Sequence, residues 1–357
     1  MYCCIDCFAD EEIRNIIHSA NIKDTCDFCG THNTYVYDID KNPAITELFE
    51  PLLEIYTPIS ELPLDFPREQ TGLMKDILHS NWQIFNCSPS VIYKLIKVLC
   101  ANRYKEQSEL FDYPIGIKES QDHSFFEENS ILKGHQWNEF VTGIKTKNRF
   151  HSNYINTGKL YTFLQCVVGT YSRSAEMYRA RICPEKGFPS SEMGAPPNYI
   201  AKAGRVNPDG ISVLYLSGLE ETTLREVRAG LHDFVTIGKF ELQQDIKIVK
   251  LTEIDHISPF LNALYGFSLT DYVINLPHLK TIAREIAEPL QNGNVLDYLP
   301  TQYICDFIRS KGYDGIEYNS TMHKGGIDLA VFDSNVFKCT ETKVCKITSI
   351  NYEHKLV

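Results

Sequence analysis

The chain has 357 residues, of which 43% are hydrophobic, and a formal net charge of −11. This length allows two domains with a substantial core, and the acidic balance argues against broad binding of nucleic acid. The chain has no apolar stretch long enough to span a bilayer, and its N-terminus lacks the basic and apolar regions of a signal peptide, so we expect a cytoplasmic protein without a membrane partner.

Cysteines are concentrated near the N-terminus, where five of the twelve fall within the first 29 residues. They include two Cys-x-x-Cys pairs separated by eighteen residues, a spacing typical of a four-cysteine structural zinc site. We therefore expect residues 1–40 to form a zinc-ribbon-like segment that binds Zn²⁺ through Cys4, Cys7, Cys26 and Cys29. Cys3 is an alternative to Cys4. A redox pair is the alternative to a metal, although the βαβ setting of a thioredoxin-like motif is missing.

The first 150 residues contain mainly helix signals. Residues 10–17 predict a short helix with Asp10 as its N-cap. Residues 41–150 are predicted to form a mostly helical domain, because apolar residues recur at helical spacing near 45–53, 73–85, 91–99 and 137–144. Ser88 and Pro89 predict the start of the third of these helices. The polar stretch 102–133 is expected to be a long surface loop with a short hairpin or extended segment.

Residues 151–357 contain most of the strand signals. The apolar segment 160–170 fits either a strand or a helix, and 178–182 is predicted to be a strand with alternating basic residues. Residues 184–199 are rich in Gly, Pro and Ser. They predict a flexible loop, which beside a pocket can act as a lid.

A turn, a strand and a helix are predicted in succession between Gly204 and Arg228. The turn is Asn207-Pro208-Asp209-Gly210, and the strand covers 211–216. The helix carries Leu224, Val227 and Leu231, with Ser217 and Glu220 as a possible capping box and Thr222 or Thr223 as alternative caps. This order brings into reach of one pocket a cation, an amide, an aromatic ring and a carboxylate: Arg205, Asn207, Tyr215 and Glu226. Such a set suits a phosphorylated, glycosidically bonded ligand, although taken alone Arg205 and Glu226 are more typical of solvated surface charges and Tyr215 of a core residue.

The remaining segments complete a mixed fold. Residues 234–242 and 246–254 are predicted to be paired strands, and 255–296 to be largely helical. A helix that opens near Tyr298 is expected to end at Gly312, followed by strands at 313–318 and 325–332. The chain lacks both the Gly-x-Gly-x-x-Gly and the Walker lysine motifs, which argues against a Rossmann or P-loop nucleotide site.

Several blocks, in one order and at matching spacing, resemble the Arg-Glu-Ser (RES) domain family from about residue 160 to about residue 337. The blocks are Tyr178-Arg179-Ala180-Arg181, Gly204-Arg205-Val206-Asn207-Pro208, Leu214-Tyr215-Leu216-Ser217, Glu221-Thr222, Arg225-Glu226-Val227, Tyr298, Thr301-Gln302, Gly312-Tyr313-Asp314-Gly315-Ile316 and Tyr318-Asn319-Ser320. The resemblance implies an α+β fold with a mainly β core, similar to ADP-ribosyltransferases and surrounded by helices. It also implies NAD⁺ as the substrate.

The resemblance assigns roles to individual residues. Glu226 is the candidate for stabilising the ribose cation, with Arg179, Tyr215 and Ser320 as further catalytic candidates. The candidates for binding the ligand are Arg205, Asn207, Arg181, Thr301 and Gln302. Two choices stay open: Arg181 can replace Arg179 if the strand has the opposite phase, and Thr301 with Gln302 can replace Ser320 as the third signature position.

The implied function is that of an NAD⁺-degrading toxin, which cleaves the nicotinamide–ribose bond with water or phosphate as acceptor and is held in check by an antitoxin. ADP-ribosylation of a protein is the competing enzymatic function, and a zinc-bearing interaction protein with a degenerate RES fold is the non-enzymatic one. Residues 41–150 resemble, more weakly, the helical HEPN-like module found before some RES domains. The nearest Arg and His, Arg14 and His18, are too closely spaced for an active HEPN ribonuclease. A homo-oligomer is compatible with these features.

Overall fold

The computed structural model describes residues 1–289 and 294–350, which group into two compact units. The helical unit consists of Met1–Gly134, Ile155–Phe163 and Asp255–His278. The sheet unit consists of His135–Tyr154, Leu164–Ile254 and Leu279–Val357. No helix within the described ranges is long and apolar enough to cross a bilayer.

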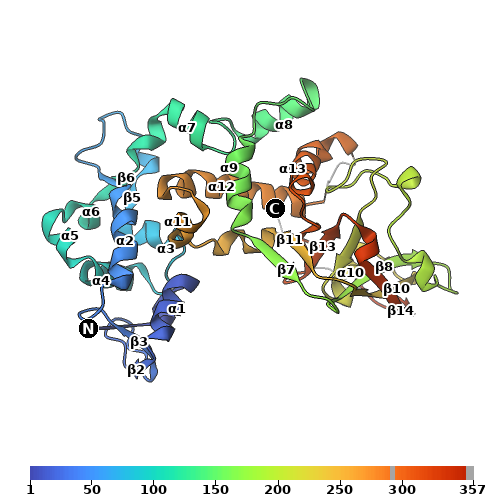
Figure 1. Ribbon diagram of the computed structural model, residues 1–357, viewed down its shortest axis with the longest axis horizontal. Helices are drawn as coiled ribbons and strands as arrows, with labels where there is room; N and C mark the ends of the chain where they lie inside the picture. The colour runs from blue at the N-terminus through green and yellow to red at the C-terminus, as the bar shows by residue number, and fades with distance from the viewer. Residues whose placement is uncertain (290–293, 351–357) are drawn as a thin grey trace. The chain divides into compact units, whose positions relative to one another are not determined.

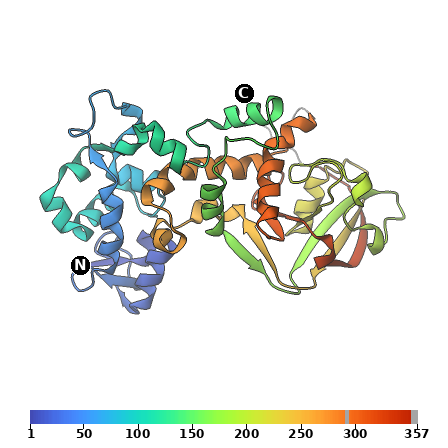
Figure 2. The ribbon, with the colours of Figure 1, turned by 45° about the horizontal axis from the view of Figure 1, so that its top comes forward.

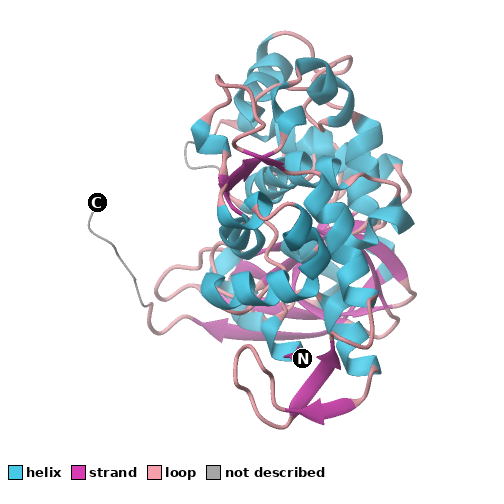
Figure 3. Cartoon of the chain, turned by 90° about the vertical axis from the view of Figure 1, so that its left-hand side faces the viewer, coloured by secondary structure: helices cyan, strands magenta, loops and turns pink. Residues whose placement is uncertain are grey.

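A small antiparallel sheet with one helix forms the N-terminal part of the helical unit (Figure 3). Its strand order is β1-β3-β2, and its elements are β1 (Tyr2–Cys4), α1 (Glu11–Ser19), β2 (Ile22–Asp24) and β3 (Thr34–Asp38). The Asp10 carboxylate accepts hydrogen bonds from the backbone N–H groups of Glu12 and Ile13 at 3.0 and 3.1 Å, which confirms the predicted N-cap. Ile13 and Ile17, four residues apart, bury one face of α1.

Short helices make up most of the rest of the helical unit. Its elements up to residue 134 are α2 (Ala44–Glu54), β4 (Thr57–Pro58), β5 (Gly72–Leu73), α3 (Met74–Ser80), α4 (Pro89–Leu99), α5 (Ala101–Glu106), α6 (Glu109–Asp112), β6 (Pro114–Gly116) and α7 (His123–Asn129), with a small sheet of order β4-β6-β5. Pro89 is the first residue of α4 as predicted, but the Ser88 side chain makes no capping bond.

The prediction of a long surface loop at residues 102–133 was wrong, although β6 corresponds to the short extended segment expected within it. This stretch contains three short helices and a strand, and its few apolar side chains, among them Leu110, Phe111 and Ile115, are buried. Asp122 caps α7 by accepting from the N–H groups of Ser124 and Phe125. Each helix is too short to show a hydrophobic period and consists mostly of polar residues, so no helix was predicted there.

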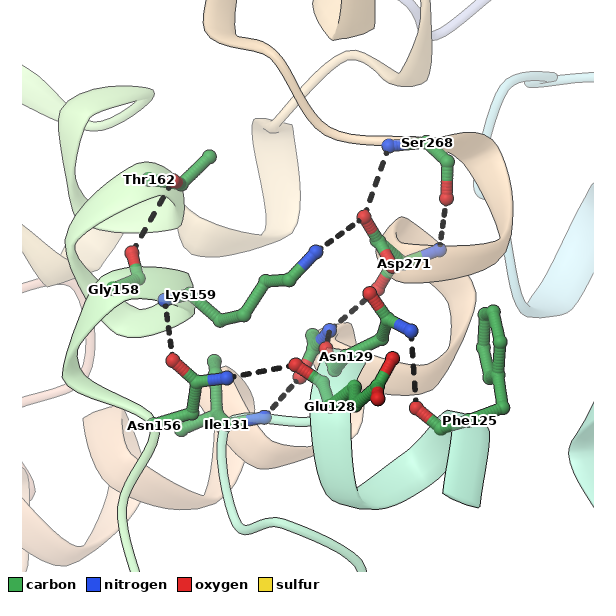
Figure 4. A network of polar contacts seen from close by, with 11 residues as sticks. Phe125, Glu128, Asn129, Ile131, Asn156, Gly158, Lys159, Thr162, Ser268 and Asp271 are labelled. Carbon is green, nitrogen blue, oxygen red and sulfur yellow. Dashed lines mark hydrogen bonds and ion pairs between the residues drawn. The ribbon is translucent and has the colours of Figure 1, made fainter. Parts of the chain in front are cut away.

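A polar network fixes the later segments of the helical unit (Figure 4). Ser268 and Asp271 exchange hydrogen bonds at the start of α12 (Leu269–Ala287), and Lys159 from α9 (Thr157–Gln165) forms an ion pair with Asp271 at 2.9 Å. The fully buried Asn275 accepts from the Ile131 N–H at 2.6 Å and donates to the Asn129 carbonyl at 2.8 Å. These bonds join segments far apart in sequence, which the helical unit needs because its chain is discontinuous.

The sheet unit is built on an eight-stranded sheet of order β14-β10-β8-β9-β13-β12-β11-β7, in which β11 and β12 are the parallel pair and the other pairs are antiparallel. Figure 1 labels most of these strands, and Figure 2 shows them from a second side. The strands are β7 (Val168–Tyr171), β8 (Glu176–Cys183), β9 (Leu214–Ser217), β10 (Phe234–Leu242), β11 (Ile246–Lys250), β12 (Gly315–Asn319), β13 (Ile327–Val331) and β14 (Phe337–Lys346). The other helices are α8 (Trp137–Thr146), α10 (Glu220–Glu226), α11 (Asn262–Tyr265, in the helical unit) and α13 (Leu299–Ser310).

This sheet must bend strongly, because residues 243–245 alone connect β10 to β11. The two strands are second and seventh in the order, which in a flat sheet would be roughly 24 Å apart. The connection spans at most roughly 14 Å. Bending lets Leu242 of β10, Ile246 of β11 and Phe337 of β14 meet in one buried cluster. A mainly β core of this kind agrees with the predicted α+β fold class.

Several element boundaries differ from the predictions. Residues 160–170 contain both the end of α9 and β7, and β9 starts only at Leu214. β10 and β11 do not pair with each other, because β10 lies between β14 and β8. Ser217 belongs to β9 rather than capping α10, which ends at Glu226 and leaves Leu231 outside it and exposed. Gly312, at φ +82°, ends α13 as predicted.

We predict that Asn275→Ala destabilises the helical unit, because the buried Ile131 N–H loses its acceptor. An unsatisfied buried group and the lost bonds together predict a fall of about 2–4 kcal/mol in the free energy of unfolding, measured by urea denaturation. Asn102→Ala, at an exposed position of α5 in the same unit, is the control and should change this free energy by less than about 0.5 kcal/mol. Equal effects of the two substitutions would contradict the structural role of Asn275.

Candidate active site and cysteine cluster

A pocket of about 380 Å³ in the sheet unit collects most of the predicted site residues. Those that line it are Arg179, Arg205, Asn207, Tyr215 and Glu226. A larger pocket of about 500 Å³ in the same unit, lined by Asp306, Arg309 and Asp333 among others, contains none of them. We therefore take the smaller pocket as the candidate active site.

Four adjacent strands supply a row of side chains to this pocket. The register of the sheet places Tyr178 of β8 opposite Ser217 of β9, Ser217 opposite Asp328 of β13, and Asp328 opposite Tyr318 of β12. Directly opposite residues point to the same face of a sheet. All four line the pocket, so strand register determines which side chains form this part of its wall.

Glu226 is the last residue of α10, and the Ser320 hydroxyl donates a hydrogen bond of 2.5 Å to its carboxylate. Ser320 follows β12 and is 8% exposed, and its oxygen also accepts from the Met322 N–H at 3.2 Å. The Thr301 hydroxyl, by contrast, donates to the Tyr298 carbonyl within the first turn of α13. Of the two alternatives for the third signature position, Ser320 is the one that contacts Glu226.

A tight loop positions Tyr215. The Tyr215 hydroxyl donates to the Asn207 side-chain oxygen at 2.7 Å, and the Asn207 amide donates to the carbonyls of Lys202 and Ile211. A Cβ atom at Gly204 would lie 2.9 Å from the Tyr215 hydroxyl, so a residue without a side chain is required there. The polar atoms of Asn207 are therefore engaged within the loop.

Gln302 supports the same loop from α13. Its side-chain amide donates to the carbonyls of Gly204 and Asn207, at 2.8 and 2.9 Å. Gln302 is 6% exposed and does not line the pocket. It fixes the backbone on either side of Arg205.

The two arginines of the pocket are oriented by backbone carbonyl groups. Arg179 donates to the Gly194 carbonyl at 2.9 Å, and Arg205 donates to the Ala287 carbonyl and lies 5.6 Å from the centre of the Tyr318 ring. Burial, with the nearby Arg181 charge, lowers the pKa of Arg179 to about 10, which leaves it protonated at neutral pH. A carbonyl oxygen orients a guanidinium without neutralising it, so both charges can attract an anion.

Arg181 contacts the loop that follows β8 instead of the pocket. It donates to the Glu192 carbonyl, and its guanidinium lies 4.4 Å from the centre of the Phe188 ring. Arg179 binds the same loop at Gly194, so the segment predicted to be a flexible lid is held at two points by β8. Arg181 does not line the pocket, which favours Arg179 as the basic residue of the pocket.

Asp328 is a pocket residue that the sequence prediction missed. It lies in the buried strand β13 and is 4% exposed, and its Oδ1 accepts from the Ser217 hydroxyl at 2.6 Å. Burial and, after it, the charge of Glu226 raise the pKa of Asp328 to about 7. One signal in the sequence could have identified Asp328: it is the single carboxylate inside the apolar run Ile327–Val331. An unpaired charge is rarely buried without a functional role.

The helical unit contains a second candidate site, formed by the four predicted cysteines. Their sulfur atoms lie within 4.8 Å of one another, with 3.7 Å from Cys4 to Cys7, 3.4 Å from Cys4 to Cys29 and 3.8 Å from Cys7 to Cys26. Tetrahedral thiolates at a metal–sulfur distance of about 2.3 Å would be about 3.8 Å apart, whereas a disulfide is near 2.05 Å. The cluster therefore fits a metal ion better than a redox pair.

The local geometry also distinguishes Cys4 from Cys3. The Cys3 thiol lies against the Tyr37 carbonyl at 4.0 Å, away from the cluster. In the second pair, the Phe28 N–H donates to the Cys26 sulfur at 3.4 Å, and Gly30, at φ +76°, closes the turn. Among the alternatives left by the sequence, the geometry selects Cys4.

Comparison with known proteins finds a family match that includes most of the sheet unit. The model of a family described as the RES domain matches residues 176–351. A comparison with curated proteins found no significant match. Among solved structures, a chain from the "Crystal structure of the M.tuberculosis MbcT-MbcA toxin-antitoxin complex" is 14% identical, with 52% of this chain and 92% of that chain covered and a TM-score of 0.31, too low to support an argument. Every residue assigned to the pocket lies within the family match, and residues 176–351 of this chain form a RES domain.

Proposed function

We propose that the pocket of the RES domain binds NAD⁺ and breaks the bond between nicotinamide and ribose. The observation that carries this proposal is one carboxylate, Glu226, in the same pocket as two guanidinium groups, Arg179 and Arg205. The guanidinium groups suit the pyrophosphate, and the carboxylate suits the positive charge that forms at ribose. The resemblance of the surrounding blocks to RES domains supports NAD⁺ as the ligand.

In this proposal the enzyme accelerates the reaction mainly by stabilising the charge that forms when the bond breaks. When the glycosidic bond breaks, its electron pair leaves with nicotinamide as a neutral molecule, and the ribose becomes an oxocarbenium-like cation. No strong general acid is needed for such a leaving group. Glu226, held by the Ser320 hydroxyl, stabilises the cation until water or phosphate adds to it and releases a proton. Tyr215 offers its ring to nicotinamide or ribose, and burial raises its pKa, so the phenol stays neutral.

The other predicted ligand-binding residues act as supports in this proposal. Asn207 and Gln302 hold the loop that presents Arg205, as their bonds to loop carbonyls indicate. Arg181 holds the loop beside Arg179, and Thr301 belongs to the first turn of α13.

The acceptor of the ribosyl group and the regulation of the enzyme also belong to the proposal. A side chain of a target protein is the alternative acceptor, which would make the enzyme an ADP-ribosyltransferase. Loss of cellular NAD⁺ would make the activity toxic, and a partner that covers the pocket, as an antitoxin does, would control it. Chromatography of the products with and without phosphate distinguishes ADP-ribose, its phosphorylated form and modified protein.

We predict that Glu226→Gln lowers kcat for NAD⁺ breakdown by about 10²–10³-fold and changes NAD⁺ affinity little, because the substitution keeps size and removes the charge that acts in the transition state. Turnover and calorimetric binding provide the two measurements. Glu221→Gln, an exposed glutamate on the same helix, is the matched control and should keep wild-type turnover. Full turnover in Glu226→Gln would remove this residue from the mechanism.

Arg205→Ala should behave differently, because it removes a phosphate-binding group. The expected result is a marked rise in the NAD⁺ dissociation constant, measured on protein whose melting temperature shows that it is folded. Unchanged affinity would contradict the assignment of Arg205 to the pyrophosphate.

The cysteine cluster is proposed to hold a structural Zn²⁺ through Cys4, Cys7, Cys26 and Cys29. Four thiolates complete a tetrahedral shell and leave no open position for substrate, so the ion would contribute to folding rather than to catalysis.

Elemental analysis should accordingly find about one zinc ion per chain. Cys26→Ser should lose the metal and lower the melting temperature of the helical unit, because metal binding contributes directly to folding. Cys3→Ser, whose thiol lies outside the cluster, is the control and should keep the metal. A metal-free chain that stays fully folded would exclude the structural zinc.

A further inference from the structure

The pocket contains a second carboxyl group, Asp328, whose hydrogen bonding is incomplete. Its Oδ1 accepts from Ser217, whereas its Oδ2 is buried and has no hydrogen-bond partner among the described residues. Glu226 lines the same pocket, and its charge raises the pKa of Asp328. Two ionised carboxylates are both acceptors, so neither can satisfy the other.

The titratable groups that line the pocket with Asp328 come from several elements, among them Tyr178 and Arg179 of β8 and Tyr298 before α13. Tyr318 on β12 and Tyr215 on β9 are neutral phenols whose pKa values are raised by burial. Arg205, on the loop before β9, lowers the pKa of Asp328, while Glu226 at the end of α10 raises it. Burial has the largest effect and acts in the same direction as Glu226, which takes the pKa of Asp328 to about 7.

A single proton on Asp328 would relieve both the repulsion between the two carboxylates and the missing hydrogen bond at Oδ2. It removes one of two like charges from a buried pocket, and it converts two acceptors into a donor and an acceptor. The flanking hydroxyl groups are already engaged: Ser320 donates to Glu226 Oε1, and Ser217 donates to Asp328 Oδ1. The unpartnered Asp328 Oδ2 is therefore the atom that gains most from carrying the proton.

We propose that Asp328 takes up a proton at mildly acidic to neutral pH and, when protonated, donates a hydrogen bond to Glu226, which makes Asp328 a positioning residue for that carboxylate. Glu226 then has two donors, Ser320 and Asp328, and remains the single negative charge of the pair. The consequence for catalysis rests on the proposed role of Glu226 in stabilising the ribose cation. The protonation of Asp328 does not depend on that role and can be tested without NAD⁺.

The first test measures melting temperature against pH for the full chain. A carboxyl group whose folded pKa lies above its unfolded value near 3.9 stabilises the protein fully at low pH, and this contribution is lost as pH rises through about 7. Asp328→Asn keeps a donor and cannot ionise. The melting temperature of Asp328→Asn minus that of the wild type should therefore increase by about 5 °C from pH 5 to pH 8. Asp65→Asn, an exposed aspartate of the helical unit, is the control and should show a constant difference.

The second test measures NAD⁺ turnover against pH in the wild type, Asp328→Asn and Asp328→Ala. Asp328→Ala should lose about tenfold or more in kcat at pH 6.5, and Asp328→Asn should restore most of this loss because its amide can donate to Glu226. The wild type should show a titration near pH 7 that is absent from Asp328→Asn. Failure of the wild type to consume NAD⁺ would contradict the proposed function alone. A pH-independent difference in melting temperature, or identical pH profiles of wild type and Asp328→Asn, would overturn the inference about Asp328.

Discussion

Strand register is the constraint on which the candidate site depends. Tyr178, Ser217, Asp328 and Tyr318 reach one pocket because they are opposite one another across β8, β9, β13 and β12. A slip of one residue in β13 would turn Asp328 to the other face and break its bond to Ser217. The bend imposed by the short connection between β10 and β11 buries the apolar residues of the strands in a common core, and this core holds the register.

Loops and helix ends supply further charged groups beside this row of side chains. The end of α10 supplies Glu226, and the turn after β12 supplies Ser320, which binds it. Gln302 of α13 fixes the loop of Arg205, and the loop after β8 is held by Arg179 and Arg181. The cationic groups are thus oriented by backbone carbonyl groups, which leave their charges available to a phosphate. Preorganised charges of this kind suit a reaction in which charge develops in the transition state.

The sequence predicted what local patterns can encode. The cysteine spacing identified a cluster in which all four sulfur atoms meet, and the blocks from Tyr178 to Glu226 identified five residues that line the pocket. Asp328 was missed because its role arises from a register between distant strands, which no local pattern contains. The helices of 102–133 were missed because each is too short to show a period, and the pairing of β10 with β11 was wrongly expected because adjacent strands usually pair.

The most direct test of the central claim is a crystal structure of Glu226→Gln with NAD⁺, since this variant should bind the substrate and turn it over slowly. We expect the nicotinamide–ribose bond to lie beside residue 226 and the pyrophosphate to contact Arg179 and Arg205. NAD⁺ bound in the larger pocket near Arg309, or bound with its nicotinamide ribose away from residue 226, would contradict it.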